Sequence, residues 1–76
     1  MNKWNENNVI GVKFHNKRST HYIIRDIGNG NIAIDYATGG VANSHWGTAK
    51  DAAEYLNQGY WYALEEPKNQ EFNIWN

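Results

Sequence analysis

The chain has 76 residues, a net charge of −1, a pI of about 6.2 and no cysteine. Its length allows one small domain, residues 1–76, which buries only about 60–65% of the surface that its unfolded chain exposes. The missing cysteines exclude disulfides and thiolate zinc sites, and the balanced charge argues against a strongly basic nucleic-acid binder and against an acidic DNA mimic. Stability must come from packing, for which four Trp, five Tyr and two Phe supply large rings.

The first eight residues, MNKWNENN, lack the apolar segment of a signal peptide. No apolar run approaches the roughly 18 residues that a membrane span requires. We therefore expect a cytoplasmic protein with no membrane segment. Residues 1–8 and 67–76 are predicted to be irregular or to pack back on the domain as tails.

The next stretch alternates between apolar and polar residues and predicts a first strand over residues 9–15. Its expected apolar face comprises Ile10, Val12 and Phe14. Residues 16–19 are polar and have the length of a hairpin connection. Residues 20–27 predict a second strand, and because neither of its faces is cleanly apolar, we expect it to be central in the sheet.

Gly28-Asn29-Gly30 is a strong turn signal, because glycine and asparagine tolerate positive φ at low cost. A third strand is predicted over residues 31–38. Gly39-Gly40 forms the next turn, and residues 41–46 make a weaker fourth strand.

The pattern then changes to that of a helix over residues 49–57. Thr48 is a good N-cap, Asp51 suits the positive end of the helix dipole, and Gly59 is placed for a left-handed C-cap. The residues that recur at spacings of three and four form the expected buried stripe. They are Ala49, Ala52, Ala53 and Leu56.

A fifth strand is predicted over residues 60–64, with Tyr60 and Tyr62 on one face and Trp61 on the other. The element order β-β-β-β-α-β predicts an α+β fold. We expect an antiparallel meander of four to five strands, open or curled into a small barrel, with the short helix packed on one face.

Enzyme chemistry finds little support in the sequence. The ionisable candidates are His15, His21, His45, Asp26 and Asp35. Ser44 and His45 are adjacent and would face opposite sides of a strand, and no set of residues supplies a nucleophile, a base and an oxyanion hole together. The glycine-rich stretches match no phosphate-binding motif. We therefore expect a non-enzymatic protein without a cofactor.

The three histidines show no metal-ligand spacing, so no metal site is predicted. If residues 16–19 form a hairpin, His15 and His21 lie close together beside it. A cation site is then one interpretation, and two ordinary surface histidines is the interpretation that we favour.

Two binding hypotheses remain. Five of the seven Lys and Arg residues lie within residues 3–25, which favours a basic hairpin that contacts nucleic acid, with exposed aromatic rings stacking on bases. The residues of this alternative are Lys13, Lys17, Arg18 and Arg25. The main hypothesis is protein binding, because a core this small cannot bury eleven aromatic rings and exposed Trp and Tyr are enriched in binding hot spots.

The residues predicted to contact a protein partner are Trp4, Tyr60, Trp61, Tyr62, Phe72 and Trp75. The partner is a host protein or a second copy, which would make a homodimer. The competing interpretation is that the N-terminal segment and the C-terminal tail fold back over the sheet and complete its core.

The pattern Trp46-x-Thr48-x-x-x-Ala52-x-x-x-Leu56-x-x-Gly59-x-Trp61 resembles one found at the ends of small accessory proteins of bacteriophages. In those proteins a capped helix leads into the last strand. The resemblance covers residues 46–61 and carries no catalytic residue. It implies a phage-encoded protein in the host cytoplasm that binds a host protein, often as an inhibitor of defence or of transcription.

Overall fold

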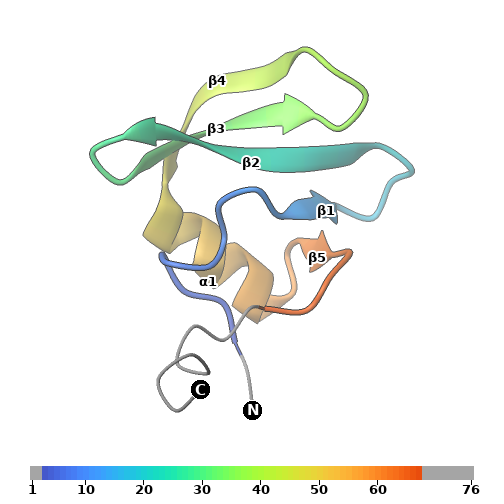
Figure 1. Cartoon of the computed structure of the whole chain (residues 1–76). Coiled ribbons are helices and arrows are strands. Elements are labelled where there is room, and N and C mark those ends of the chain that lie inside the picture. Colours follow the sequence, from blue (N-terminus) through green and yellow to red (C-terminus); the bar gives the residue numbers. More distant parts are fainter. Residues whose placement is uncertain (1–2, 68–76) are drawn as a thin grey trace, which may run out of the picture.

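The computed structural model describes residues 3–67 and shows one antiparallel sheet of five strands with one helix. In chain order the elements are β1 (Lys13–His15), β2 (His21–Gly28), β3 (Asn31–Tyr36), β4 (Val41–Thr48), α1 (Ala49–Gln58) and β5 (Tyr62–Ala63). The strand order is β4-β3-β2-β1-β5, so the chain returns through α1 to add β5 beside β1 (Figure 1). This confirms the predicted α+β fold. The sheet is curled but does not close into a barrel, and β4 and β5 are its edges.

Local signals explain the β2–β3 hairpin. Gly28 pairs with Asn31, which leaves Asn29 and Gly30 as a two-residue turn, and both have positive φ, 57° and 78°. Two central residues with positive φ match the right-handed twist of the flanking strands. The turn predicted from Gly28-Asn29-Gly30 is therefore confirmed.

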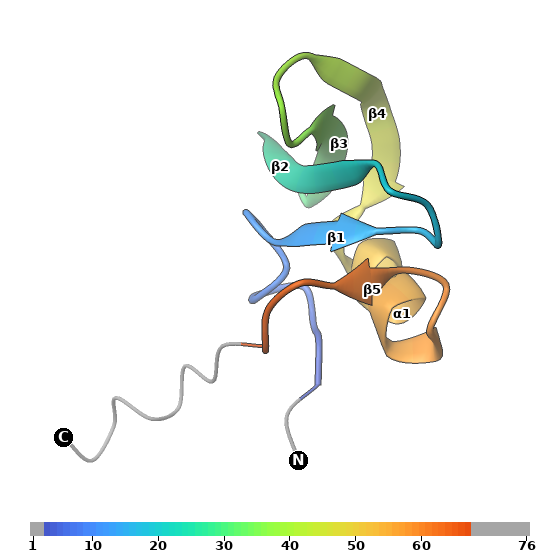
Figure 2. The same ribbon diagram turned by 90° about the vertical axis from the view of Figure 1, so that its right-hand side faces the viewer.

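The helix α1 also forms as predicted, one residue longer at its C-terminal end. Thr48 Oγ1 accepts a hydrogen bond from the backbone N–H of Asp51 at 3.1 Å, and Gly59 ends the helix in the left-handed conformation with φ 86°. The predicted stripe faces the sheet. Its buried residues are Ala49, Ala52, Ala53 and Leu56. Because alanine is small, the helix approaches the strands closely, and it lies on one side of β1 and β5 in Figure 2.

The core lies between α1 and the sheet face that the helix covers. Its largest fully buried side chains are Phe14, Ile24, Ile32 and Val9. Burial of each such side chain stabilises the fold by about 1.5–3 kcal/mol. Among residues 3–67, no helix has the length and apolar character needed to cross a membrane.

The first strand is shorter than predicted, because a turn replaces its first half. Gly11 has φ 84°, and the N–H of Val12 donates to the carbonyl of Val9 at 3.1 Å. The turn sends both valines into the core and leaves Ile10 45% exposed. The prediction that Ile10 shares a buried face with Phe14 is therefore wrong, since strict alternation ends where the backbone turns.

The N-terminal segment packs back on the domain at Trp4. Its side chain is buried, and its backbone N–H and carbonyl each form a 2.9 Å hydrogen bond with the side-chain amide of Asn57 in α1. The interpretation in which the N-terminal segment completes the core is thus correct for Trp4.

Candidate functional site

The candidate site is an open pocket of about 170 Å³ on the helix side of the sheet. Residues from β1, β2, β3 and β4 line it, together with the loop after β1 and the turn before β5. They are Phe14, Asn16, Tyr22, Ile34, Ala42, Asn43, Trp46 and Trp61. Four of these eight side chains are aromatic and none is charged. A cavity of about 150 Å³ lined by apolar groups holds one benzene-sized molecule, so this pocket has room for a single apolar side chain.

Strand register places a row of aromatic rings on one sheet face, and two of them, Phe14 and Tyr22, line the pocket. Phe14 pairs with Tyr22 across β1 and β2, and Tyr22 pairs with Tyr36 across β2 and β3. Residues directly opposite each other on antiparallel strands share a face. The three rings therefore form a row, with ring centroids 5.5 Å apart for Phe14 and Tyr22 and 5.6 Å apart for Tyr22 and Tyr36.

Trp46 reaches the pocket because β4 is irregular. Asn43 and Trp46 are three residues apart, so a regular strand would point them to opposite faces, yet both line the pocket. Asn43 pairs with Ile34 and Gly47 pairs with Ile32, so β4 has extra residues in this interval. Asn43 Oδ1 accepts a hydrogen bond from the N–H of His45 at 3.1 Å and stabilises the irregular turn of the chain. Bulges of this kind redirect side chains next to functional sites.

Trp61 joins the strand wall of the pocket to the helix. Its ring stacks on Phe14 with a centroid separation of 4.1 Å, and it lies 4.8 Å from Trp46 and 5.1 Å from Tyr55 of α1. Trp61 is buried, whereas Trp46 is half-buried and Tyr55 is exposed. These ring contacts link the pocket wall to α1.

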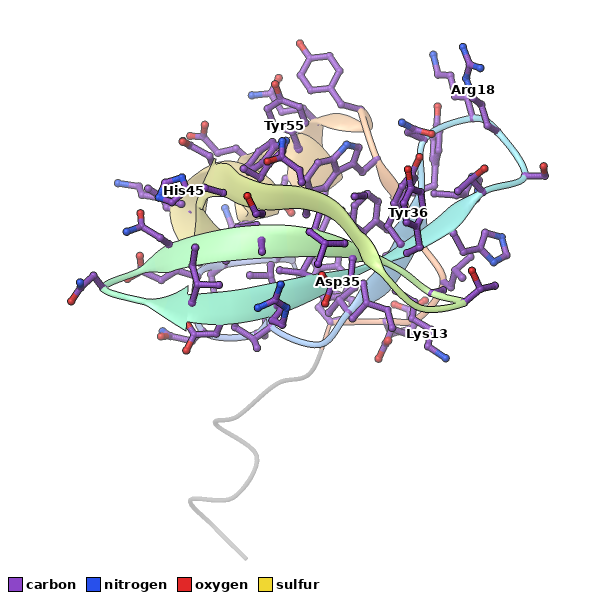
Figure 3. All side chains as sticks on the ribbon, turned by 90° about the horizontal axis from the view of Figure 1, so that it is seen from above. Lys13, Arg18, Asp35, Tyr36, His45 and Tyr55 are labelled. Atoms are coloured by element: carbon purple, nitrogen blue, oxygen red, sulfur yellow. The ribbon has the colours of Figure 1, made fainter. Side chains whose placement is uncertain are left out.

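Two basic residues lie in the connection between β1 and β2, next along the chain from the pocket. Lys17 and Arg18 directly follow the pocket residue Asn16, and both side chains are exposed. Within residues 3–67, neither forms an ion pair. Figure 3 places Arg18 on the same side of the sheet as Tyr36, and Lys13 on the opposite side with Asp35.

The structure therefore separates the four cations that sequence analysis grouped as nucleic-acid contacts. Arg25 lies on the open face of the sheet, where its guanidinium contacts Asp35 at 2.7 and 3.2 Å. The hydrogen bond and the charge of Asp35 raise the pKa of Arg25. Its charge is thus compensated within the protein. Lys17 and Arg18 remain together near the pocket, and Lys13 does not join them.

The six predicted partner contacts have different positions. Trp4 and Trp61 are core residues, while Tyr60 is 60% exposed and Tyr62 is 40% exposed. Phe72 and Trp75 lie outside the described residues. Whether any of the six contacts a partner stays a prediction, and the burial of Trp4 and Trp61 favours a structural role for these two.

The predicted face of the last strand is wrong for Tyr60. The backbone N–H groups of Tyr60 and Trp61 both donate to the carbonyl of Tyr55 at the end of α1, at 3.0 and 3.3 Å. These bonds hold residues 60 and 61 against the helix, so β5 begins only at Tyr62. The ring of Tyr60 lies 5.2 Å from that of Tyr55, whereas Tyr62 lies 5.4 Å from His15 on the open face.

The hairpin brings His15 and His21 together, as the sequence indicated it would. They are register partners in β1 and β2, with ring centroids 5.7 Å apart. Residues 3–67 contain no group of three or more His, Cys, Asp or Glu side chains arranged for a metal ion. No hydrogen bond joins a serine to a histidine in this part of the chain.

Sequence reasoning missed the pocket itself. Phe14 lies in the predicted first strand and Tyr22 in the predicted second strand. If a hairpin is assumed at residues 16–19, these two rings can be expected side by side on one face. Trp46 carried no such signal, because strict alternation on β4 does not put it with Asn43. The pocket depends on a register shift that only pairing with β3 reveals.

Comparison with protein-family models, with curated proteins and with solved structures finds no match to this chain. The resemblance of residues 46–61 to phage accessory proteins therefore stays a prediction.

Proposed function

We propose that the protein is a non-enzymatic peptide-binding module. An extended segment of a partner protein lies along β4 and inserts one large apolar side chain into the pocket formed by Phe14, Tyr22, Trp46 and Trp61. The observation that carries this proposal is that a pocket sized for one side chain shares a wall with β4, an edge strand of the sheet.

The edge of β4 supplies the main-chain part of such an interaction. Within residues 3–67, β4 pairs with β3 alone, so the backbone groups of its outer side are available to another chain. An added strand gains affinity from main-chain hydrogen bonds and specificity from pockets that take alternate side chains. One buried apolar side chain would add about 1.5–3 kcal/mol.

The positive charge near the pocket indicates which residues the bound segment carries beside its apolar side chain. Lys17 and Arg18 follow the pocket residue Asn16 in the chain and form no ion pair within residues 3–67, and no acidic residue lines the pocket. A segment with Asp or Glu next to its apolar anchor is therefore favoured over a basic one, chiefly through faster association. From the phage resemblance, the partner would be a bacterial host or defence protein in the host cytoplasm, and binding would inhibit it.

A randomised peptide library selected against the full chain tests the proposal. Enriched peptides should share one large apolar or aromatic residue flanked by Asp or Glu. In Ala42→Lys, a lysine at the mouth of the pocket should weaken the selected peptides by roughly tenfold, since about 1.4 kcal/mol is tenfold in affinity. Ser44→Lys is the matched control, because Ser44 is exposed on the same strand but does not line the pocket.

Two results would contradict the proposal. One is a selection with no enriched peptide, and the other is equal binding of the selected peptides to wild type and Ala42→Lys.

Nucleic-acid binding is the second candidate, supported by the half-buried Tyr22 and exposed Tyr36 beside the uncompensated Lys17 and Arg18. It predicts that a single-stranded oligonucleotide binds with an affinity that falls steeply with salt. The pairing of Arg25 with Asp35 and the position of Lys13 on the other side of the sheet weaken this candidate. If titration with an oligonucleotide at low salt shows no binding, the nucleic-acid candidate is excluded.

A further inference from the structure

The open face of the sheet carries a second group of side chains, formed by His15, His21 and Tyr62. His15 and Phe14 are neighbours in β1, so their side chains point to opposite faces, and this group lies across the sheet from the aromatic pocket. The pairing of β1 with both β2 and β5 brings the three residues together. His15 lies in the middle, with the His21 ring centroid at 5.7 Å and that of Tyr62 at 5.4 Å.

Nδ1 of His15 is a buried nitrogen without a hydrogen bond in the described part of the chain. It is shielded from solvent and has no hydrogen-bond partner among residues 3–67. A buried polar atom left without a partner destabilises the folded state. A group that coordinates this nitrogen would satisfy it, and the neighbouring His21, which is exposed, carries further imidazole nitrogens that can bind the same ion.

The ring separation fits two imidazoles that share one metal ion. An imidazole nitrogen lies about 1.1 Å from its ring centroid and binds zinc at about 2.0–2.1 Å, so two rings on one ion have centroids roughly 5–6 Å apart. The observed 5.7 Å lies within this range. The strand register sets this spacing, and Tyr62 packs on His15 and limits its rotation.

We propose that His15 and His21 form a two-histidine site for Zn²⁺, Ni²⁺ or Cu²⁺, whose remaining coordination positions are open to water or to a donor from another molecule. The metal class follows from the ligands. Neutral imidazole suits zinc, nickel and copper, while calcium and magnesium require several oxygen ligands, and the pair includes no carboxylate. The site is independent of the peptide-binding proposal, because it uses the opposite face of the sheet.

The test is titration of the metal-free full chain with Zn²⁺, followed by calorimetry and by the histidine ring signals in NMR spectra. We expect one ion per chain, with the ring signals of His15 and His21 shifting together and those of His45 unchanged. Cu²⁺ should bind more tightly than Ni²⁺ or Zn²⁺, in the usual order for nitrogen sites, and Mg²⁺ should not compete.

His21→Ala is the decisive variant, since His21 is exposed and its loss should leave the fold intact, as judged by the far-UV circular dichroism spectrum. It should weaken Zn²⁺ binding by at least about tenfold, within the range of changes that follow loss of a supporting group at a metal site. His45→Ala is the matched control and should bind as wild type does. Retention of wild-type affinity in His21→Ala, or shifts confined to His45, would overturn the proposal.

Discussion

The two ends of the helix-covered sheet face are built differently. At one end, aliphatic residues such as Ile24 and Ile32 lie under α1 with Ala52, and all three are fully buried. At the other end, aromatic rings contact one another beside an open pocket. The helix has ten residues and spans only about 15 Å, so its alanine stripe covers the aliphatic end, and at the aromatic end it contributes the ring of Tyr55. The comparison teaches that the aliphatic end is a closed core, whereas the aromatic end combines buried rings with the open pocket that we propose to bind a peptide.

The largest expected effect breaks the aliphatic end. Ile32→Ala removes a fully buried side chain and should lower the free energy of unfolding by about 2–5 kcal/mol, because a cavity is left under the helix. Urea-induced unfolding measures this. Ile10→Ala is the control, because Ile10 is partly exposed, and it should change stability by no more than about 0.5 kcal/mol. Equal effects in both variants would show that the assigned core is wrong.

At the aromatic end, we expect a substitution to reduce peptide affinity more than stability. Trp46 is half-buried, so Trp46→Leu should cost only about 1–2 kcal/mol of stability, less than a fully buried large-to-small change. It should nevertheless weaken selected peptides by roughly tenfold, as loss of a hot-spot aromatic does. Unfolding and peptide titration of the same variant give the two numbers. A variant that loses stability and keeps peptide affinity would assign Trp46 to the core alone.

A smaller effect on stability is expected at the N-cap of α1, the helix that covers the aliphatic end. Thr48→Ala removes the oxygen that accepts the Asp51 N–H and should cost about 1 kcal/mol, a typical value for an N-cap. Thr48→Asp keeps an acceptor and should restore most of this stability. Thermal or urea unfolding of both variants checks the prediction, and equal stability of the two would argue against the cap.

The smallest effect on stability is expected on the open face of the sheet, opposite the face that contains both ends. Arg25→Gln breaks the exposed ion pair with Asp35 and should lower the melting temperature only slightly. Because salt screens exposed charges, the difference from wild type should disappear in about 1 M NaCl, where the Debye length is about 3 Å. A difference that persists in high salt would mean that Arg25 acts by packing.

The elements predicted best are those whose signals are local. The ends of α1 are set within a dozen residues by Thr48, Asp51 and Gly59. The β2–β3 turn is set by the two residues Asn29 and Gly30, which both have positive φ. The predictions that failed lie where the backbone turns instead of continuing a regular strand. The expected position of Ile10 ignored the turn at Gly11, and the expected face of Tyr60 ignored the hydrogen bonds to the end of the helix.

The sequence by itself determined the fold class, the capped helix with its buried alanine stripe and the proximity of His15 to His21, because hydrophobic period, capping and hairpin length act over short separations. Only the tertiary structure decided the pairing of β5 with β1, the inward turn of Trp46 and the compensation of Arg25 by Asp35. Each of these depends on strand register, which is set by contacts between distant residues. The aromatic pocket is a product of that register, and so it is visible only in the folded chain.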